Sequence, residues 1–269
     1  MTSNFESAGY KDVPAHAAPG ANRSWWDSQS RDYLAEHGDF LGDADLVWGP
    51  EGISEDDANY LGDVRDLCVL EVGGGGAQGG RWAQASGANV MSLDLSHGML
   101  RVGQELSQNT GVFPQLLQAD AQALPLAGAA FDLAFSSYGA IPFVPDLDGV
   151  HREVYRVLKP GGRWIFATTH PIRWAFPDAP TEIGLTANRS YFDRTPYSER
   201  DASGNVTYVE YHRTLGDHVG ALRAAGFTIM AIKEPQWPED NTETWGGWSP
   251  LRGKIIPGTV IFSAQKPSS

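Results

Sequence analysis

From residue 66 to the end of the chain, short apolar runs alternate with segments that have one apolar face. An apolar run of about 4 to 8 residues bounded by turn residues is typical of a buried strand, whereas apolar positions spaced i, i+4, i+7 and i+8 indicate a helix. The runs predict strands at 67–72, 89–94, 115–120, 131–136, 163–169, 227–233 and 258–264. The amphipathic segments predict helices at about 78–86, after Ser96, at 148–158 and at 214–225.

Strands that alternate with helices along a chain are typical of an α/β fold with a doubly wound, mostly parallel sheet. Two segments interrupt the alternation and are expected to form a cap. Residues 171–213 are predicted to contain an antiparallel hairpin that turns at Ser203-Gly204-Asn205. Residues 235–257 are rich in Pro, Gly and Trp and are predicted to form a loop.

The N-terminal segment differs in composition from the rest of the chain. Residues 1–22 are rich in Ala, Gly, Pro and Ser, which predicts a loose tail. A helix that carries several aromatic residues is expected next, with Asn22 or Ser24 as its N-terminal cap. We therefore predict one structural domain, with a tail and lid helices over 1–65 and the main α/β unit over 66–269.

The chain is acidic, since its 269 residues hold 20 Lys and Arg against 33 Asp and Glu, a net charge of −13. Phosphate backbones and anionic membranes repel such a surface, so we expect neither a nucleic acid nor a membrane as partner. The single cysteine, Cys68, excludes an intrachain disulfide, and no histidine pair has the spacing of a zinc site, so no bound metal is expected. The N-terminus lacks the apolar core of a signal peptide, and no apolar run approaches a membrane span, which predicts a cytoplasmic protein.

A glycine-rich loop, LEVGGGGAQGG (70–80), follows the first predicted strand and precedes a helix. Glycines let a ligand approach the backbone closely, and the helix N-terminus offers free N–H groups. Acids mark three successive strands, because Glu71 lies on the first, Asp94 ends the second and Asp120 ends the third. A carboxylate at such a strand end can accept hydrogen bonds from both hydroxyls of a ribose.

The same loop allows a second interpretation. Gly74, Gly76 and Gly79 have the G-x-G-x-x-G spacing of a dinucleotide-binding loop, which suits an NAD-dependent oxidoreductase. Acids at the sheet edge favour a ligand with a ribose and amine groups over a pyrophosphate, although helix N–H groups offset part of the repulsion. The oxidoreductase therefore stays open as an alternative.

Four segments, 71–77, 92–100, 118–144 and 153–169, resemble in sequence and order the motifs of class I S-adenosylmethionine-dependent methyltransferases of the small-molecule type. Ala77 departs from the family's first motif, which has glycine at that place. The resemblance implies a seven-stranded Rossmann-like sheet with an antiparallel last strand and an inserted cap. It also implies methyl transfer from S-adenosylmethionine to a small-molecule acceptor, with S-adenosylhomocysteine as the product.

The resemblance further implies which residues bind the cofactor. Asp94 takes the ribose-binding place with Leu95 beside the adenine, and Asp120 reaches the adenine amino group with the Ala121 backbone nearby. The full set of implied cofactor contacts is Glu71, Gly73, Gly75, Ala77, Asp94, Leu95, Met99, Asp120, Ala121 and Ser136, with Trp26 and Tyr33 expected to cap the cofactor.

Methyl transfer is an in-line displacement in which positioning supplies much of the rate, and a base is needed only for an acceptor that arrives protonated. Tyr138 follows the fourth predicted strand and is a candidate to position an acceptor, or else a packed loop residue. His170 follows the fifth strand and is a candidate base, or else a structural histidine. A methyltransferase that acts on RNA or protein stays open as an alternative, and a homodimer is compatible with the sequence.

Most tryptophans lie outside the segment that carries the motifs. Seven of the nine fall in the N-terminal segment, the 171–213 insertion and the late loop: Trp25, Trp26, Trp48, Trp174, Trp237, Trp245 and Trp248. Large aromatic side chains serve either as a lid over a planar acceptor or as the core of a small cap. The sequence leaves both interpretations open.

Overall fold

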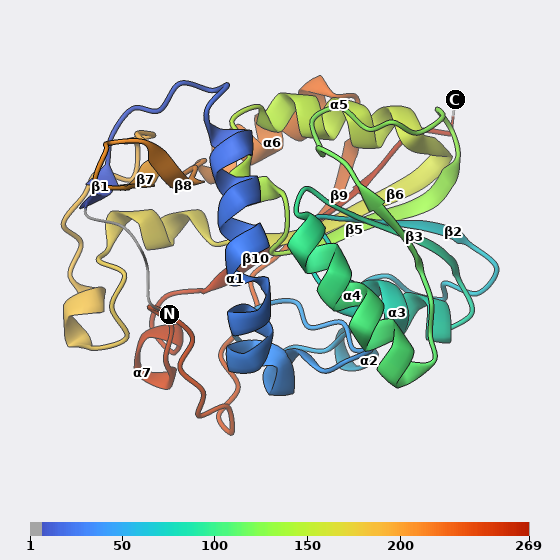
Figure 1. Ribbon diagram of the computed structural model, residues 1–269, viewed down its shortest axis with the longest axis horizontal. Helices are drawn as coiled ribbons and strands as arrows, with labels where there is room; N and C mark the ends of the chain where they lie inside the picture. Colours follow the sequence, from blue (N-terminus) through green and yellow to red (C-terminus); the bar gives the residue numbers. More distant parts are fainter. Residues whose placement is uncertain (1–6, 269) are drawn as a thin grey trace.

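The computed structural model describes residues 7–268 and contains two sheets (Figure 1). The larger sheet is built from β2 (Cys68–Val72), β3 (Asn89–Asp94), β4 (Gln115–Gln118), β5 (Phe131–Ser137), β6 (Leu158–Thr169), β9 (Thr228–Lys233) and β10 (Thr259–Gln265). Its strand order is β4-β3-β2-β5-β6-β10-β9, with β10 antiparallel to both neighbours and the pairs from β4 to β6 parallel. The predicted seven-stranded, mostly parallel α/β sheet is confirmed.

The helices follow the strands as the apolar spacing predicts. They are α3 (Gln78–Ala85), α4 (His97–Thr110), α5 (Leu147–Val157) and α6 (Leu215–Ala224), while the short helices α2 (Glu55–Ala58) and α7 (Pro250–Gly253) lie in connections. Ser96 caps α4 by accepting from the Met99 N–H, and Thr214 with Asp217 forms a capping box on α6. Across residues 7–268, no helix is long and apolar enough to cross a bilayer.

The predicted boundaries shift by one or two residues at several strands, so that β4 ends at Gln118, before Asp120, and the largest shift is at β6. β6 begins at Leu158, directly after α5, rather than at residue 163. Gly161 and Gly162 extend the strand because they exchange backbone hydrogen bonds with Lys266, beyond the end of β10. The helix still stops before the Pro-Gly-Gly turn, as predicted.

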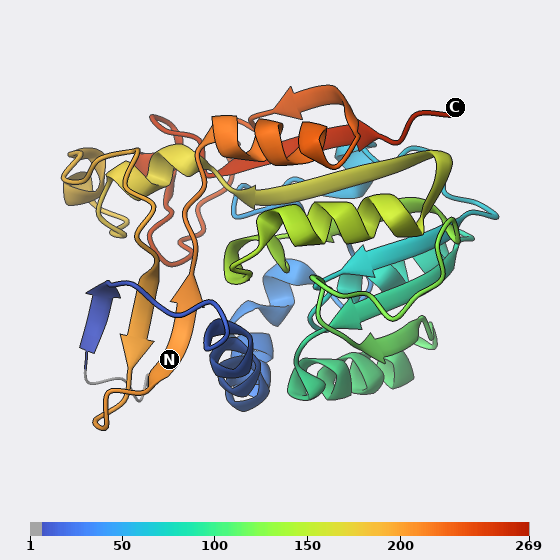
Figure 2. The ribbon, with the colours of Figure 1, turned by 90° about the horizontal axis from the view of Figure 1, so that it is seen from above.

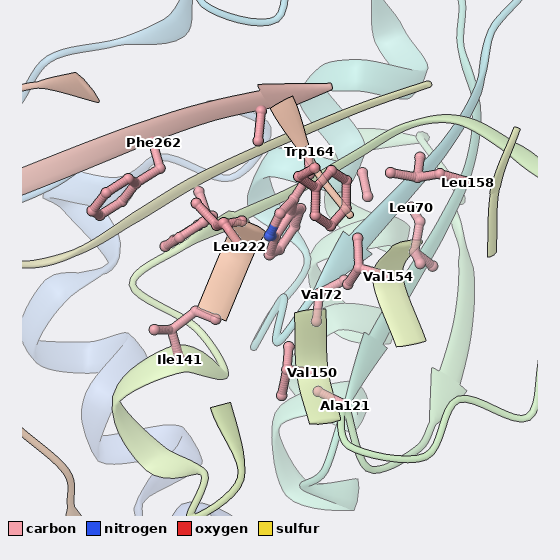
Figure 3. Packing of buried hydrophobic residues seen from close by; sticks show 14 of the residues in the cluster. Leu70, Val72, Ala121, Ile141, Val150, Val154, Leu158, Trp164, Leu222 and Phe262 are labelled. Carbon is pink, nitrogen blue, oxygen red and sulfur yellow. The ribbon is translucent and has the colours of Figure 1, made fainter. Parts of the chain in front are cut away.

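Two buried clusters cover the two faces of the large sheet. Successive residues of a strand point to opposite faces, so Leu70 enters the cluster under α5 and α6, whereas Val69 enters the cluster under α3. Figure 3 shows the first cluster, in which Trp164 and Phe262 lie near Leu222 of α6. Both faces are thereby sealed, which leaves the strand ends as the place for a ligand.

The N-terminal segment is more ordered than predicted. β1 (Ser7–Tyr10) and the long helix α1 (Ala18–Leu41) take up nine of the 16 described residues of the segment expected to be a loose tail, and residues 1–6 lie outside the described part of the chain. Asn22 is no helix cap, since it is buried inside α1, donates to the Phe143 and Val209 carbonyls and accepts from the Val209 N–H. The tail and both proposed caps, Asn22 and Ser24, were wrong because these long-range bonds hold the segment in place.

The smaller sheet forms the cap. Its order is β1-β7-β8, all antiparallel, with β7 (Tyr197–Arg200) and β8 (Val206–Glu210) joined by the predicted turn around Ser203 to Asn205. Short turns of 3-10 helix precede the hairpin: η1 (Ile141–Phe143), η2 (Pro171–Ala175) and η3 (Glu182–Leu185). Helix α1 contacts β8 on one side and α4 on the other, so it joins the cap to the large sheet (Figure 2).

Candidate cofactor and acceptor site

A first cavity of about 160 Å³ opens at the carboxyl ends of β2, β3 and β5. Its walls come from the glycine loop, the ends of these strands, the start of α4 and the facing residues of α1. Four acids line it, Asp45, Glu71, Asp94 and Asp120, and none of the lining residues within 7–268 is Lys or Arg. Such a wall accepts hydrogen bonds from hydroxyl and amine groups and repels a pyrophosphate.

The backbone of the glycine loop lies very close to the neighbouring segments of the protein. Gly73 has a φ of +66°, and a Cβ on it would lie 2.3 Å from the backbone nitrogen of Ala140. A Cβ on Gly74 would lie 2.6 Å from the Glu71 carboxylate. Both glycines are therefore required by the closeness of the loop to its surroundings, before any ligand is considered.

Glu71 sits beneath this loop and is 4% exposed. It accepts a hydrogen bond from Ser92 Oγ, and burial raises the pKa of its carboxyl to about 7, opposed in part by Ser92 and by the nearby Arg81 guanidinium. The glycine loop therefore rests on a buried carboxyl that takes up a proton more readily than an exposed glutamate does.

Asp94, at the end of β3, binds the backbone of the glycine loop and the backbone at the start of α4. Its Oδ2 accepts from the Gly75 N–H at 2.9 Å and its Oδ1 from the Ser96 N–H at 2.8 Å. Burial raises the pKa of this carboxyl, and these two hydrogen bonds oppose the rise. Each oxygen keeps a lone pair for a ligand hydroxyl. Asp120 is held in a similar way, since it accepts from the backbone and the side chain of Gln122.

A second cavity of about 550 Å³ adjoins the first. It lies among α1, the cap sheet and the 245–248 segment. The two cavities share six wall residues: Trp26, Tyr33, Leu41, Val47, Ser137 and Tyr138. The two cavities therefore adjoin at these mostly apolar side chains, where a molecule in one can approach a molecule in the other.

The tryptophans divide between the two roles that the sequence left open. Trp25, Trp26, Trp245 and Trp248 line the second cavity. Trp48 is fully buried and donates to Glu55, so it belongs to the core of the main unit. Trp174 and Trp237 are buried and line neither cavity.

Tyr138 stands on the shared wall with a φ of +54°, an unusual conformation for a residue with a side chain. Its hydroxyl lies 2.6 Å from Thr259 Oγ1 and 3.0 Å from the Gly258 carbonyl oxygen. Burial raises the pKa of this phenol well above its usual value. Tyr138 therefore lines both cavities while its neutral hydroxyl is held by hydrogen bonds to Thr259 and Gly258.

His170 lies outside both cavities. Its Nδ1 accepts from the Ile172 N–H at 3.1 Å, and its Nε2 lies 2.8 Å from the Glu234 carboxylate. Nδ1 caps η2 and Nε2 is paired with Glu234, so both ring nitrogens have partners within the protein, which favours the structural histidine that the sequence left open over the candidate base. Within residues 7–268, no cluster of side chains suited to a metal ion is found.

Comparison with known proteins decides the family. A family model described as "Methyltransferase domain" matches residues 70–166. A solved S-adenosylmethionine-dependent methyltransferase from Mesorhizobium loti is 31% identical, has a TM-score of 0.63, and is matched over 81% of this chain and 100% of that one. The chain belongs to the S-adenosylmethionine-dependent methyltransferases. The NAD-dependent oxidoreductase is left without support.

Curated relatives of this methyltransferase match mainly in the motif-bearing segment. The malonyl-(acyl-carrier protein) O-methyltransferase of Pseudescherichia vulneris is 41% identical over 108 residues, 40% of this chain and 41% of that one. The demethylmenaquinone methyltransferase of Thermus thermophilus is 33% identical over 157 residues, 54% of this chain and 66% of that one. The chain spans about two fifths of the length of the first curated relatives it matches.

A more distant solved structure shows the same fold over nearly the whole methyltransferase chain. The 1,6-didemethyltoxoflavin-N1-methyltransferase of Burkholderia thailandensis has a TM-score of 0.60 and 18% identity, covering 97% of this chain and 95% of that one. That structure contains bound 1,6-didemethyltoxoflavin and S-adenosylhomocysteine. At this identity the similarity establishes the fold, and the ligands are those of that protein.

The first cavity fits the family's cofactor, S-adenosylmethionine. This molecule has ribose hydroxyls, an adenine amino group and an ammonium group, and it has no phosphate, so it suits a cavity that four acids line and that has no Lys or Arg among its described lining residues. Ten of the twelve implied contact residues line this cavity: Trp26, Tyr33, Glu71, Gly73, Gly75, Asp94, Leu95, Met99, Asp120 and Ala121.

Two implied contact residues of the methyltransferase do not line the cavity. Ala77 is fully buried with a φ of +57° and provides the left-handed turn at the start of α3. Ser136 is also buried, whereas its neighbour Ser137 faces both cavities. Sequence reasoning missed Asp45 and Val47, because residues 42–65 show no periodic pattern that could place them against the strand ends.

Proposed function

We propose that this protein transfers a methyl group from S-adenosylmethionine, bound in the first cavity, to a small molecule bound in the second. The wall of six residues shared by the two cavities carries the proposal. The cofactor supplies a methyl group on an electrophilic sulfonium. The protein has to bring an acceptor atom to that methyl group in line and to keep water away, which is what the adjoining cavities allow.

The residues that we propose to hold the cofactor act through acceptor atoms and backbone. Asp94 accepts from the ribose hydroxyls, Asp120 from the adenine amino group, and the backbone of Gly73 and Gly75 lets the cofactor lie close to the end of β2. Trp26 and Tyr33 cover the cofactor from α1. The cap and the aromatic walls of the second cavity then define which acceptors enter.

We infer that the shared wall contributes to methyl transfer mainly by positioning the acceptor. Ser137 Oγ donates to the Val47 carbonyl oxygen at 2.6 Å, and the Tyr138 hydroxyl is bound to Thr259 and Gly258. Neither hydroxyl is free to remove a proton from an acceptor. The side chains of the wall therefore orient the acceptor and exclude water rather than act as bases.

An acceptor that loses a proton on methylation needs a base, and we assign that role to His37. It lines the second cavity and stacks on Trp245, with ring centroids 4.1 Å apart. Burial lowers the pKa of its imidazole, opposed in part by Glu36, so the neutral form that can take a proton dominates at neutral pH.

We propose a free small molecule, rather than RNA or protein, as the acceptor. The net charge of −13 disfavours RNA, and the second cavity has the size of a small-molecule site. The cytoplasmic location and the homodimer stay predictions from the sequence.

Thermal unfolding with added ligands tests the proposed cofactor. S-adenosylmethionine and S-adenosylhomocysteine at about 100 times their dissociation constants should each add about 2.7 kcal/mol of stability. For a chain of 269 residues this raises Tm by roughly 5 to 10 °C. NAD at the same concentration should leave Tm unchanged, and a rise with NAD alone would contradict the proposal.

A further inference from the structure

The cap sheet presents alternating tyrosines and glutamates to the second cavity. Tyr197 and Glu199 lie two residues apart on β7, and Tyr208 and Glu210 lie two apart on β8. Residues two apart on a strand share a face, and the register places Tyr197 opposite Glu210 and Glu199 opposite Tyr208. All four side chains line the second cavity. Figure 2 shows the two strands in orange beside α1 in blue, with α4 on the other side of α1.

The four side chains Tyr197, Glu199, Tyr208 and Glu210 form a patch in which the tyrosine hydroxyls donate hydrogen bonds to the glutamate carboxylates. The Tyr197 hydroxyl donates to Glu199 Oε1 at 3.1 Å, and the Tyr208 hydroxyl donates to Glu210 Oε1 at 2.5 Å. Among residues 7–268, none donates a hydrogen bond to the second oxygen of Glu199. The patch therefore offers a ligand acceptor atoms, and a ligand group that binds there has to be a donor.

The charge on this wall is unbalanced. Three carboxylates line the cavity, those of Asp178, Glu199 and Glu210, against one guanidinium, that of Arg173. Arg173 lies 2.8 Å from Asp178 and 3.8 Å from Glu210, and Arg252, which does not line the cavity, lies 3.6 Å from Asp178, so these two guanidinium groups are paired with Asp178 and Glu210. Glu199 is left without a cation, and burial together with Glu210 raises the pKa of its carboxyl.

His37, which lines the same cavity from α1, is a second observation that points to a ligand. It is 8% exposed, and its Nε2 has no hydrogen-bond partner within the described part of the chain. The nearest carboxylate, on Glu36, lies 3.9 Å away, which is too far for a hydrogen bond. A buried nitrogen of this kind is costly unless a bound molecule completes its hydrogen bonding.

We propose that the acceptor is an aromatic compound with a positively charged amine, and that Glu199 binds the amine while the rings of the cavity enclose the aromatic part. The inference rests on the proposed function and adds the substrate class. Tyr197 precedes Glu199 by two residues and Tyr208 lies opposite it on β8, so two aromatic rings, a kind of side chain that can attract a cation, line the cavity beside this carboxylate. Glu199 does not line the cofactor cavity, so the charged amine is a recognition group and the methylated atom lies at the shared wall.

An anionic acceptor is the opposing case. A carboxylate would need Arg173, but Asp178 and Glu210 already hold that guanidinium, and Glu199 would repel the ligand. Three probes of matched shape separate these cases: tryptamine, which is a cation, tryptophol, which is neutral, and indole-3-acetate, which is an anion.

The experiment measures the dissociation constants of the three probes with the full chain saturated with S-adenosylhomocysteine, by ligand-observed NMR. Tryptamine should bind at least about tenfold more tightly than the other two, because a hydrogen bond to a charged group is worth that much. Glu199→Gln should remove this preference, while Glu239→Gln, at an exposed position that lines neither cavity, should retain it.

The same samples separate this inference from the proposed function. If S-adenosylhomocysteine itself fails to bind, the proposed function fails. If it binds but tryptamine shows no preference, or shows no binding at about 1 mM, the weak limit of specific binding, the cationic acceptor is overturned. A preference for tryptamine that survives in Glu199→Gln overturns the role of Glu199. Unchanged S-adenosylhomocysteine affinity in that variant shows that it is folded.

Discussion

The Asp94 carboxylate accepts a hydrogen bond from the Gly75 N–H at 2.9 Å and so fastens the glycine loop to the end of β3. The same carboxylate accepts from Ser96 at the start of α4. Three segments of the cofactor cavity thus meet at one side chain, which also lines the cavity. Asp94 has two tasks, to shape the loop and to offer its remaining lone pairs to a ribose.

Asp94→Ala should weaken S-adenosylhomocysteine binding by about a hundredfold or more. The ribose hydroxyls lose a charged acceptor, and hydrogen bonds to charged groups contribute about 1.5–3 kcal/mol each. Isothermal titration calorimetry gives the affinity, with Asp63→Ala, at an exposed position outside both cavities, as the control. Equal affinities for Asp94→Ala and the parent protein would remove Asp94 from the cofactor site.

Gly73→Ala should be more destabilising than Gly111→Ala, although both glycines have a φ near +70°. Both substitutions carry the backbone strain, about 1 kcal/mol. The new Cβ at residue 73 also meets the Ala140 nitrogen at 2.3 Å, whereas the one at residue 111 meets nothing within 4 Å. Urea unfolding should show the difference, and Gly73→Ala alone should also weaken cofactor binding. Equal effects at both positions would show that the close approach to Ala140 is unimportant.

His37→Gln should lower kcat by about a hundredfold for an acceptor that loses a proton, the lower range of general-base catalysis. Because burial lowers the pKa of this imidazole below 6.5, the neutral base predominates at pH 7. The kcat of the parent protein should therefore be flat from pH 8 to about 6.5 and fall under more acidic conditions. The variant should lack the acidic fall that His37 causes, and an unchanged profile would exclude this role.

Two core histidines should make the fold sensitive to acid. Burial lowers the pKa of His151 and of His218 to about 3. Between pH 6.5 and 3 the unfolded chain binds protons that the folded chain refuses, so stability falls as the pH falls through this window. Within this window each histidine should lower the free energy of unfolding by about 1.4 kcal/mol for every unit by which the pH falls.

Chemical unfolding at several pH values tests this dependence. His218→Leu should reduce the slope of unfolding free energy against pH by about one proton, and His97→Gln, at an exposed position on α4, should not. An identical slope in His218→Leu and the parent protein would show that His218 does not stay neutral in the fold.

The large sheet could be predicted because its signals are local. Each buried strand is a short apolar run, and Asp94 and Asp120 follow such runs at positions that the parallel topology brings to one edge. Ser96 and Thr214 cap α4 and α6 by accepting from backbone N–H groups only three residues further along the chain. These features depend on residues that are close together in the sequence, so they can be recognised without knowledge of the tertiary structure.

The acceptor cavity could not be predicted in the same way. Its walls combine α1, β7, β8 and the 245–248 segment, which are far apart in the chain. Asn22 illustrates the difficulty, since its partners Phe143 and Val209 are 121 and 187 residues away. A polar residue in an Ala- and Gly-rich segment indicates a loop or a cap, and only the tertiary contacts show that it is buried.

The structure of the protein with S-adenosylhomocysteine, determined by crystallography, tests the central claim most directly. The account predicts that the nucleoside lies between Asp94 and Asp120 in the first cavity, with the sulfur facing the wall that contains Trp26 and Tyr138. The second cavity should remain open to an acceptor, which meets the methyl-bearing side of the cofactor where the shared residues line both cavities. A ligand bound in the second cavity, or bound in the first with its sulfur turned away from the shared wall, would contradict the account.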